Sequence, residues 1–267
     1  LSLGIPDAHR EENTMTKNLR FGFTAYDAIL ACMLAKKGFT GPIRVVEGDS
    51  GFRQVILQGD MDLEQLVNFS GWRILRTWHK ALCANASTQG HVYATIALVK
   101  KHDLKPEDVA SVQIKTSPRV YRHTTTPSKK YPRNAESADH SAYYANAIAI
   151  MERDFGPASI KPKKFTDPMV LDLIEKMTVE PDPNLSKYSG ISEIITKDGR
   201  RFQERVDLPH GKGSDPLTDA ELEEKFRAMA IKYMGKEQIQ NIFDIVWDLE
   251  NLEDMRRLTK LMVFATR

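Results

Sequence analysis

The sequence predicts a mixed fold, in which an all-helical domain formed by the N-terminal part of the chain and its C-terminal tail carries an inserted α+β domain with a small antiparallel sheet. Three observations predict it. Apolar residues recur every three or four positions near both ends, they alternate in the middle, and an Asp-Gly pair joins two alternating segments. We therefore assign residues 1–87 and 213–267 to the helical domain and residues 88–212 to the α+β domain.

The first predicted helix covers residues 23–37, because its apolar side chains fall on one helical face. These side chains are Phe23, Tyr26, Ile29, Leu30, Met33 and Leu34. Gly38 ends the helix, and further glycines at positions 41, 48 and 51 favour loops between packed helices.

The middle of the chain alternates between helix and strand. We expect helices over residues 88–100 and 137–153, another beginning at Asp167-Pro168, and strands over residues 109–115 and 177–180. Residues 191–197 and 201–208 form a hairpin around Asp198-Gly199, because both central positions of such a turn need a positive φ. Residues 119–136 are polar and basic, and form a long excursion that is either a functional lid segment or simply mobile.

The tail returns to helix. Thr218 and Glu221 have the spacing of a capping box, in which each side chain accepts a hydrogen bond from a backbone N–H of the other residue. Apolar residues then continue at three- and four-residue intervals to Leu252.

Composition excludes several classes of protein. The chain has 267 residues, enough for one large or two ordinary domains. Hydrophobic residues make up 41% and charged residues 28%, which excludes collagen-like and wholly disordered chains. The 38 Lys and Arg residues nearly balance the 36 Asp and Glu residues, so no global charge favours nucleic acid or an anionic membrane as a partner.

We expect a soluble cytoplasmic protein. No apolar run approaches the roughly 18 residues of a membrane span, and the N-terminus lacks the order of a signal peptide. Two cysteines, Cys32 and Cys83, are too few for a disulfide framework. Because residue 1 is Leu, we also expect either a fragment or a processed chain.

No motif with strong specificity of its own is present. The sequence lacks a GxGxxG after a strand, a Walker loop, an HExxH and a GxSxG. Its histidines show no metal-ligand spacing, so we predict neither a metal site nor a cofactor.

Five groups of segments, in order along nearly the whole chain, nevertheless resemble one family. They are TKNLRFGFTA (16–25), LAKKGFTGP with EG and GF (34–52), WHK with STQGH (78–91), ADHS (138–141), and DGR with PHG, PLT and EKF (198–226). This combination resembles the MmgE/PrpD family.

The resemblance implies metal-independent enzymes that act on di- and tricarboxylates, usually as homodimers, with a site between a large helical domain and a smaller α+β lid. We expect first a dehydratase (a hydro-lyase) like those that act on 2-methylcitrate in propionate metabolism. An epimerase, a decarboxylase, and a catalytically silent fragment or family member acting as an interaction protein remain alternatives. Family members carry a further helical segment, before the point where this chain starts, that supplies several site groups.

The resemblance also implies the site residues. Lys17 matches a lysine that would anchor a substrate carboxylate, with Thr16 shaping its loop, although a solvated surface lysine is the alternative. Gln89 stands where relatives have a histidine and cannot transfer protons, so His91, two residues later, is the candidate for that role. A structural role for His91 is the competing interpretation.

Two further positions complete the expected site. Asp139 and His140 open a predicted helix whose N-terminus favours anions, and His140 is the third catalytic candidate after Lys17 and His91. Asp139 is expected to bind substrate together with Thr16, Ser87 and Gln89, or else to serve only as a first-turn acid. Cys83 is expected to be a buried, inert thiol.

Overall fold

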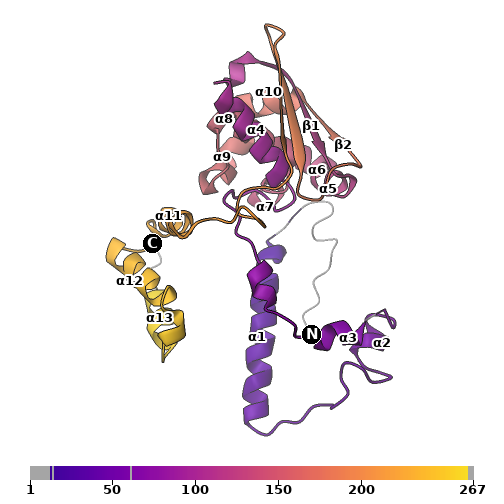
Figure 1. The fold of residues 1–267 in the computed structure, drawn as a ribbon, viewed down its shortest axis with the longest axis vertical. Coiled ribbons are helices and arrows are strands. Elements are labelled where there is room, and N and C mark those ends of the chain that lie inside the picture. The colour runs from indigo at the N-terminus through magenta and orange to yellow at the C-terminus, as the bar shows by residue number, and fades with distance from the viewer. Residues whose placement is uncertain (1–12, 14, 61, 264–267) are drawn as a thin grey trace. The chain divides into compact units, whose positions relative to one another are not determined.

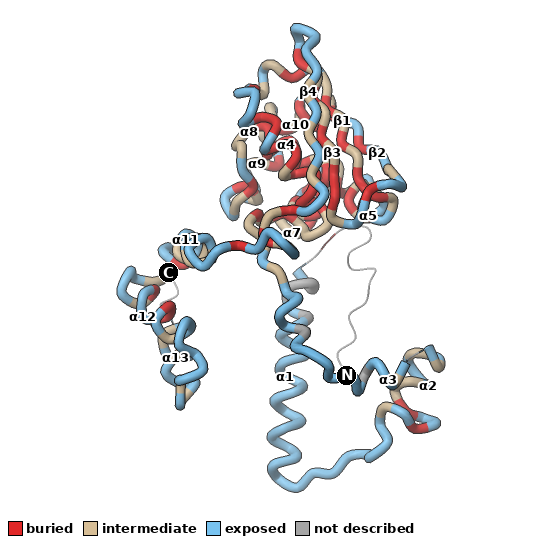
Figure 2. Tube along the Cα trace, viewed as in Figure 1, coloured by how far each residue is buried: buried red, intermediate tan, exposed pale blue. Residues whose placement is uncertain are grey.

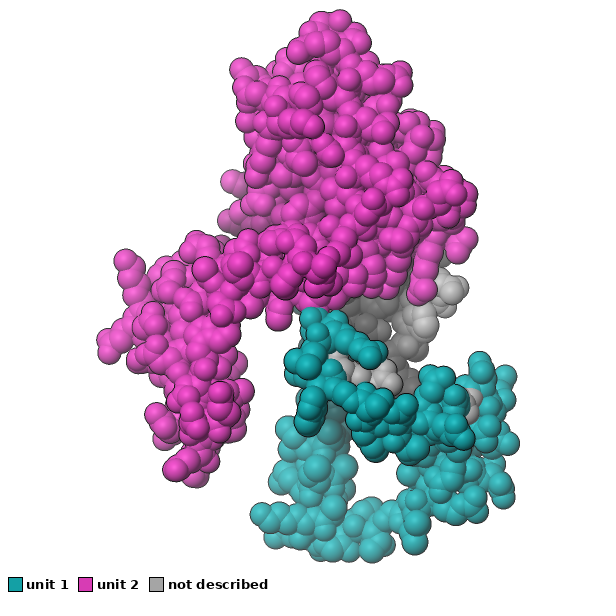
Figure 3. All heavy atoms as spheres, in the orientation of Figure 1, with its two compact units in different colours: residues 1–77 teal, residues 78–267 magenta. Residues whose placement is uncertain are grey.

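The computed structural model describes residues 13, 15–60 and 62–263. The chain divides into two compact units, residues 1–77 and residues 78–267 (Figure 3).

Among the described residues of the first unit, all regular structure is helical. It consists of α1 (Thr16–Lys36), α2 (Phe52–Val55), α3 (Leu63–Val67) and the 3₁₀ helix η2 (Arg73–Arg76). Helix α1 begins earlier than its apolar pattern predicts and ends as expected before Gly38, which has a φ of +85°. The described apolar side chains of α1 are largely exposed, as the pale-blue helix in Figure 2 shows.

The second unit contains a four-stranded sheet in the order β2-β1-β3-β4. Its strands are β1 (Val109–Thr116), β2 (Met177–Pro181), β3 (Gly190–Thr196) and β4 (Arg201–Val206). The expectation of an antiparallel sheet is wrong for one pair: β1 and β2 are parallel, while β1 pairs antiparallel with β3, and β3 with β4. The reason is the long helical connection between β1 and β2, which returns the chain to the same end of the sheet.

The core of this unit lies between the sheet and three helices, α4 (Gln89–Lys101), α8 (Ala142–Glu152) and α10 (Pro168–Glu175) (Figure 1). Val112 and Ile114 of β1 are buried, while Ser111, Gln113 and Lys115 between and beside them are half-buried, as the alternation predicts. Asp167 caps α10 by accepting a hydrogen bond from the backbone N–H of Met169 at 2.9 Å, which confirms the start predicted at Asp167-Pro168.

The expected excursion at residues 119–136 is instead packed structure. Three short helices fill it, α5 (Pro118–Thr124), α6 (Pro127–Lys130) and α7 (Ala135–Ala138). Proline supplies a suitable first helical residue to two of them, and Val120 and Lys129 are buried. Further short helices of the unit are η3 (Pro106–Asp108), η4 (Pro157–Ile160) and α9 (Pro162–Phe165).

The tail forms α11 (Asp219–Ala230), α12 (Lys236–Val246), η5 (Leu249–Asn251) and α13 (Arg256–Leu261). The capping box predicted at Thr218 and Glu221 is confirmed, with both reciprocal hydrogen bonds present. A second, small core of Ala230, Ile239 and Phe243 holds α11 and α12 together. Within the part of the chain that the structure describes, no helix is long and apolar enough to cross a bilayer.

Candidate functional site

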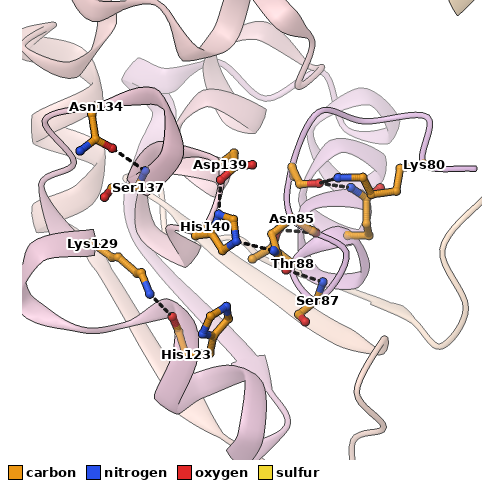
Figure 4. Close-up of polar contacts among 12 residues, drawn as sticks. Lys80, Asn85, Ser87, Thr88, His123, Lys129, Asn134, Ser137, Asp139 and His140 are labelled. Atoms are coloured by element: carbon orange, nitrogen blue, oxygen red, sulfur yellow. Dashed lines mark hydrogen bonds and ion pairs between the residues drawn. The ribbon is translucent and has the colours of Figure 1, made fainter. Parts of the chain in front are cut away.

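The candidate site lies where the turn between α7 and α8 meets the segment that precedes α4 (Figure 4). The sequence pattern predicts one helix over residues 137–153, but the chain breaks at Asp139 and His140, and Ser141 caps α8 by accepting a hydrogen bond from the N–H of Tyr144 at 2.9 Å. Asp139 is therefore at the end of α7 rather than at the start of α8. The break places the His140 imidazole in a buried turn, with a residue exposure of 3%.

His140 is held from both sides of its ring. Its Nδ1 is hydrogen-bonded to a carboxylate oxygen of Asp139, and its Nε2 lies 2.7 Å from Nδ2 of Asn85. A backbone hydrogen bond of 2.8 Å from the N–H of Asn85 to the carbonyl of Asp139 joins the same two segments. The three side chains thus form an Asp139–His140–Asn85 chain of polar contacts, which the dashed lines in Figure 4 mark.

The segment before α4 is folded by its own polar groups. The backbone N–H of Ser87 donates to Oδ1 of Asn85 at 2.8 Å, and both the N–H and the hydroxyl of Thr88 donate to the carbonyl of Asn85. The Gln89 amide donates to the carbonyls of Ala84 and Leu82, at 2.7 and 3.3 Å. Gln89 is fully buried, and its Oε1 is without a hydrogen-bond partner among the described residues.

A second group borders His140 on the other side. The ring of His123 meets the ring of His140 edge to face, with centroids 5.5 Å apart. Nζ of the fully buried Lys129 donates to the carbonyl of His123 at 2.5 Å, and Lys129's own carbonyl accepts a hydrogen bond from the hydroxyl of Ser141. The basic segment therefore turns one of its lysines into the interior beside the candidate site.

His91 lies elsewhere in the interior, in the first turn of α4. It is fully buried, and Nδ2 of Asn146 donates to its Nδ1 at 2.8 Å. Asn146 in turn accepts from the hydroxyl of Thr95 at 2.7 Å, and that hydroxyl also contacts Ser192. Burial lowers the pKa of His91 to about 4, so the imidazole is neutral at pH 7.

The structure thus brings Ser87, Asp139 and His140 together through Asn85, with Gln89 packed beneath the same segment, whereas His91 makes its hydrogen bonds with a separate network. Thr16 and Lys17 form the first turn of α1, and their side chains lie outside the described residues. Their approach to His140 stays a prediction.

Sequence patterns did not identify Asn85 or His123 as site residues, and they placed Lys129 only in a basic segment that is either a functional lid or mobile. One usable signal existed at Asn85: Asn followed two residues later by Ser is typical of a turn in which the side-chain oxygen accepts a backbone N–H. Contacts between residues far apart in sequence, such as His140 with Asn85 and His123, leave no such local trace.

Cys83 is less buried than expected from the sequence. It is half-buried, and burial raises the pKa of its thiol against the opposing effect of Lys225 and Lys80. Over the described ranges, no group of three or more His, Cys, Asp or Glu side chains is arranged as a metal site would require.

The sequence matches two domain models of one protein family. The model of the MmgE/PrpD C-terminal domain matches residues 83–250, more than half of the chain, and that of the MmgE/PrpD N-terminal domain matches residues 3–64. The chain belongs to the MmgE/PrpD family. The match to the C-terminal domain includes every residue of the Asp139–His140–Asn85 arrangement.

Three curated relatives share less than a third of their aligned residues with this chain. A cis-aconitate decarboxylase of Homo sapiens is 28% identical over 265 residues, covering 93% of this chain and 53% of that protein. A cis-aconitate decarboxylase of Mus musculus is 27% identical over 258 residues, covering 93% and 52%. A cis-aconitate decarboxylase-like protein of Aspergillus oryzae is 23% identical over 266 residues, covering 93% and 55%. The chain therefore spans about half the length of the curated relatives it matches.

Proposed function

We propose that this chain carries the proton-transfer part of a lyase that acts on a small di- or tricarboxylate, with decarboxylation of a cis-aconitate-like substrate as the reaction. The observation that carries the proposal is the buried His140 imidazole between Asp139 and Asn85. Family membership and the three relatives named for cis-aconitate decarboxylation support the choice of reaction.

The chemistry needs one group that handles a proton and others that hold carboxylates. In a decarboxylation the bond from carbon to a carboxylate breaks, carbon dioxide leaves, and the electron pair remains on carbon beside a second carboxylate. That carbon then takes a proton. An imidazole suits this step because it exchanges protons near neutral pH, and a carboxylate on Nδ1 orients the ring and stabilises its protonated form.

We assign the proton-transfer role to His140 rather than to His91. The burial of His91, its hydrogen bond with Asn146 and its neutral state support a structural role for it. Asp139 positions His140 through Nδ1. Ser87 and Gln89 remain candidates for polar contacts with substrate, and the buried, unpartnered Oε1 of Gln89 supports this for a hydroxyl or a protonated carboxyl group.

Lys17, with Thr16 beside it, is proposed as the anchor of a substrate carboxylate. The support is the position of the Thr-Lys pair in the segment that resembles the family pattern, within the match to the N-terminal domain. A compact ammonium charge next to a carboxylate stabilises negative charge that builds up on the neighbouring carbon.

We also propose the assembly expected from the sequence: one helical domain built from residues 1–87 and 213–267 together with further helices, the α+β lid of residues 88–212, and a homodimer. The exposed apolar side chains of α1 support it, because a helix that is apolar on several faces is normally surrounded by other helices. Leu19, Phe23, Tyr26, Leu30 and Met33 alone are between 42% and 64% exposed.

Dehydration of a 2-methylcitrate-like substrate is the second candidate. It uses the same basic nitrogen in the opposite direction, because a proton beside a carboxylate is removed and hydroxide leaves the neighbouring carbon as water once protonated. The contact of Nδ1 with Asp139 supports it equally, because that contact leaves the lone pair on Nε2, which becomes available to substrate once the Asn85 amide moves aside. Analysis of products separates decarboxylation, which releases carbon dioxide, from dehydration, which converts the substrate to an alkene, and from epimerisation, which inverts a stereocentre.

The test combines His140→Gln with the surface variant His102→Gln. Both proteins are assayed with cis-aconitate and 2-methylcitrate, alone and after addition of the helical half of a relative that this chain does not span. We expect turnover to fall at least a hundredfold in His140→Gln and to stay unchanged in His102→Gln. Equal turnover in both variants would remove His140 from the mechanism. Tight binding of these anions by wild type without any turnover would identify a catalytically silent member.

A further inference from the structure

Two hydrogen bonds determine the orientation of the Asn85 side-chain amide. Oδ1 accepts a hydrogen bond from the backbone N–H of Ser87 at 2.8 Å, and Nδ2 lies 2.7 Å from Nε2 of His140 (Figure 4). A backbone N–H can only donate, so the atom that faces Ser87 must be the carbonyl oxygen. The atom that faces His140 is therefore the NH₂ group, which donates.

This orientation determines the protonation of the ring. Because Nδ2 of Asn85 donates to Nε2 of His140, Nε2 must present its lone pair. The proton of the neutral ring is then on Nδ1, where the carboxylate of Asp139 accepts it. A rotation of the Asn85 amide would bring its NH₂ against the N–H of Ser87, so the Ser87 contact opposes the other tautomer.

We propose that Asn85 is a positioning residue that holds His140 as the Nδ1-protonated tautomer, with the basic lone pair on Nε2. The inference rests on the proposed function only for its consequence in catalysis. Asn85 supports the same tautomer that Asp139 favours by accepting from Nδ1. Because Nε2 has one lone pair, it exchanges a proton with substrate only after the Asn85 amide has moved off it.

The rest of the segment keeps Asn85 in place. Its N–H donates to the carbonyl of Asp139, and its carbonyl accepts from both the N–H and the hydroxyl of Thr88, at 3.0 and 2.9 Å. These backbone contacts remain when only the side chain at position 85 is changed, so a side-chain variant alters the tautomer without removing the turn.

The tautomer is measured directly by nitrogen-15 NMR of the full chain labelled at histidine, with the His140 signals identified by their loss in His140→Gln. We expect wild-type His140 to show a protonated Nδ1 and an unprotonated Nε2. In Asn85→Ala only Asp139 holds the proton on Nδ1, so the share of the Nε2-protonated tautomer should rise. In Asn85→Asp the ring should become protonated at both nitrogens, because a carboxylate at this position accepts from Nε2 as well as from Ser87. Asn184→Ala, at an exposed asparagine, should leave the His140 signals unchanged.

Two results would overturn the inference: a wild-type ring protonated at Nε2, or a tautomer that stays the same in Asn85→Ala. Asn85→Asp keeps an oxygen facing Ser87, so it remains informative if Asn85→Ala fails to fold. In activity assays we expect Asn85→Ala to lower kcat tenfold to a hundredfold at a nearly constant KM. Full activity with a mixed tautomer would also contradict the positioning role.

The two proposals fail separately. A tautomer that responds as expected in a chain that turns over no carboxylate, even after addition of the part of a relative that this chain does not span, would remove the proposed function and leave the role of Asn85 intact. Turnover that depends on His140, together with a His140 tautomer that is the same with and without the Asn85 side chain, would leave the proposed function intact and remove the role of Asn85.

Discussion

Gly190 of β3 lies against the backbone of His91 in α4. A Cβ atom added at position 190 would come within 2.6 Å of both Cα and Cβ of His91. Gly190→Ala therefore forces α4 away from the sheet in the centre of the core. We expect the free energy of unfolding to fall by about 1–3 kcal/mol, as for other overpacked cores. Denaturant unfolding followed by circular dichroism measures the change.

A matched glycine provides the control for this prediction. A Cβ added at Gly22 of α1 would meet nothing within 4 Å, so Gly22→Ala should leave the unfolding of residues 78–267 unchanged and raise helix stability by about 1 kcal/mol. If Gly190→Ala proved as stable as wild type, the close approach of β3 and α4 would be wrong.

Acid should destabilise the fold through His91. The buried ring has its pKa lowered from 6.5 to about 4, so the unfolded chain binds more protons between these values. The stability that the neutral, buried His91 ring contributes is fully present above pH 6.5 and is lost as the pH falls toward 4. The full difference is about 3 kcal/mol, at about 1.4 kcal/mol per pH unit. Urea midpoints measured across this range test it.

The variant His91→Gln should flatten this dependence of stability on pH and should be less stable than wild type above pH 6.5, because Gln cannot reproduce the fit to Asn146. His102→Gln, at the end of α4, should keep the wild-type slope. An unchanged slope in His91→Gln would show that the acid sensitivity comes from other groups.

His210 should respond to pH in the opposite direction. Hydrogen bonds raise the pKa of His210 above 6.5; the bond with Asp215 has the largest effect, and the bond with Glu221 the next largest. Its contribution to stability is therefore present below pH 6.5 and is lost as the pH rises through the raised value. Proton NMR titration of the ring measures the pKa. Asp215→Asn and Glu221→Gln should each lower it, whereas a pKa that ignores both changes would contradict these contacts.

Lys129 should matter far more to stability than its neighbour Lys130. Lys129→Ala removes a completely buried side chain and the donor to the carbonyl of His123, so we expect a loss of about 2–4 kcal/mol. Lys130 makes a partly exposed ion pair with Glu175 at 3.5 Å, and Lys130→Ala should cost about 1 kcal/mol or less. Thermal unfolding compares the two, and equal losses would refute the burial of Lys129.

Local signals predicted local structure well. Asp198-Gly199 forms the expected hairpin turn, with Gly199 at a φ of +87°, because few residues other than glycine adopt that backbone conformation. Thr218 and Glu221 form their capping box for a similar reason, since the partners are only three residues apart. At Asp139 and His140 the local pattern failed, because the chain breaks there between α7 and α8 instead of opening a helix.

Long-range features were predicted less well. The periodicity of β2 indicates a strand but not its direction, which depends on the whole connection from β1. The burial of Lys129 contradicts the usual behaviour of a basic segment, because the neighbouring short helices supply a carbonyl inside the protein. His91 fits its network with Asn146 and Ser192 only through contacts between α4, α8 and β3.

The parallel pairing of β1 with β2 has a consequence for how the polypeptide reaches its native state. The hairpin of β3 and β4 joins residues that are close in sequence, whereas β1 pairs with β2 and with β3 across the whole helical connection. Such non-local pairing is slow, so the folding rate should be limited by the docking of β2 and β3 on β1. Until that step the outer edge of β1 is an open template for another chain, and aggregation during synthesis should begin there.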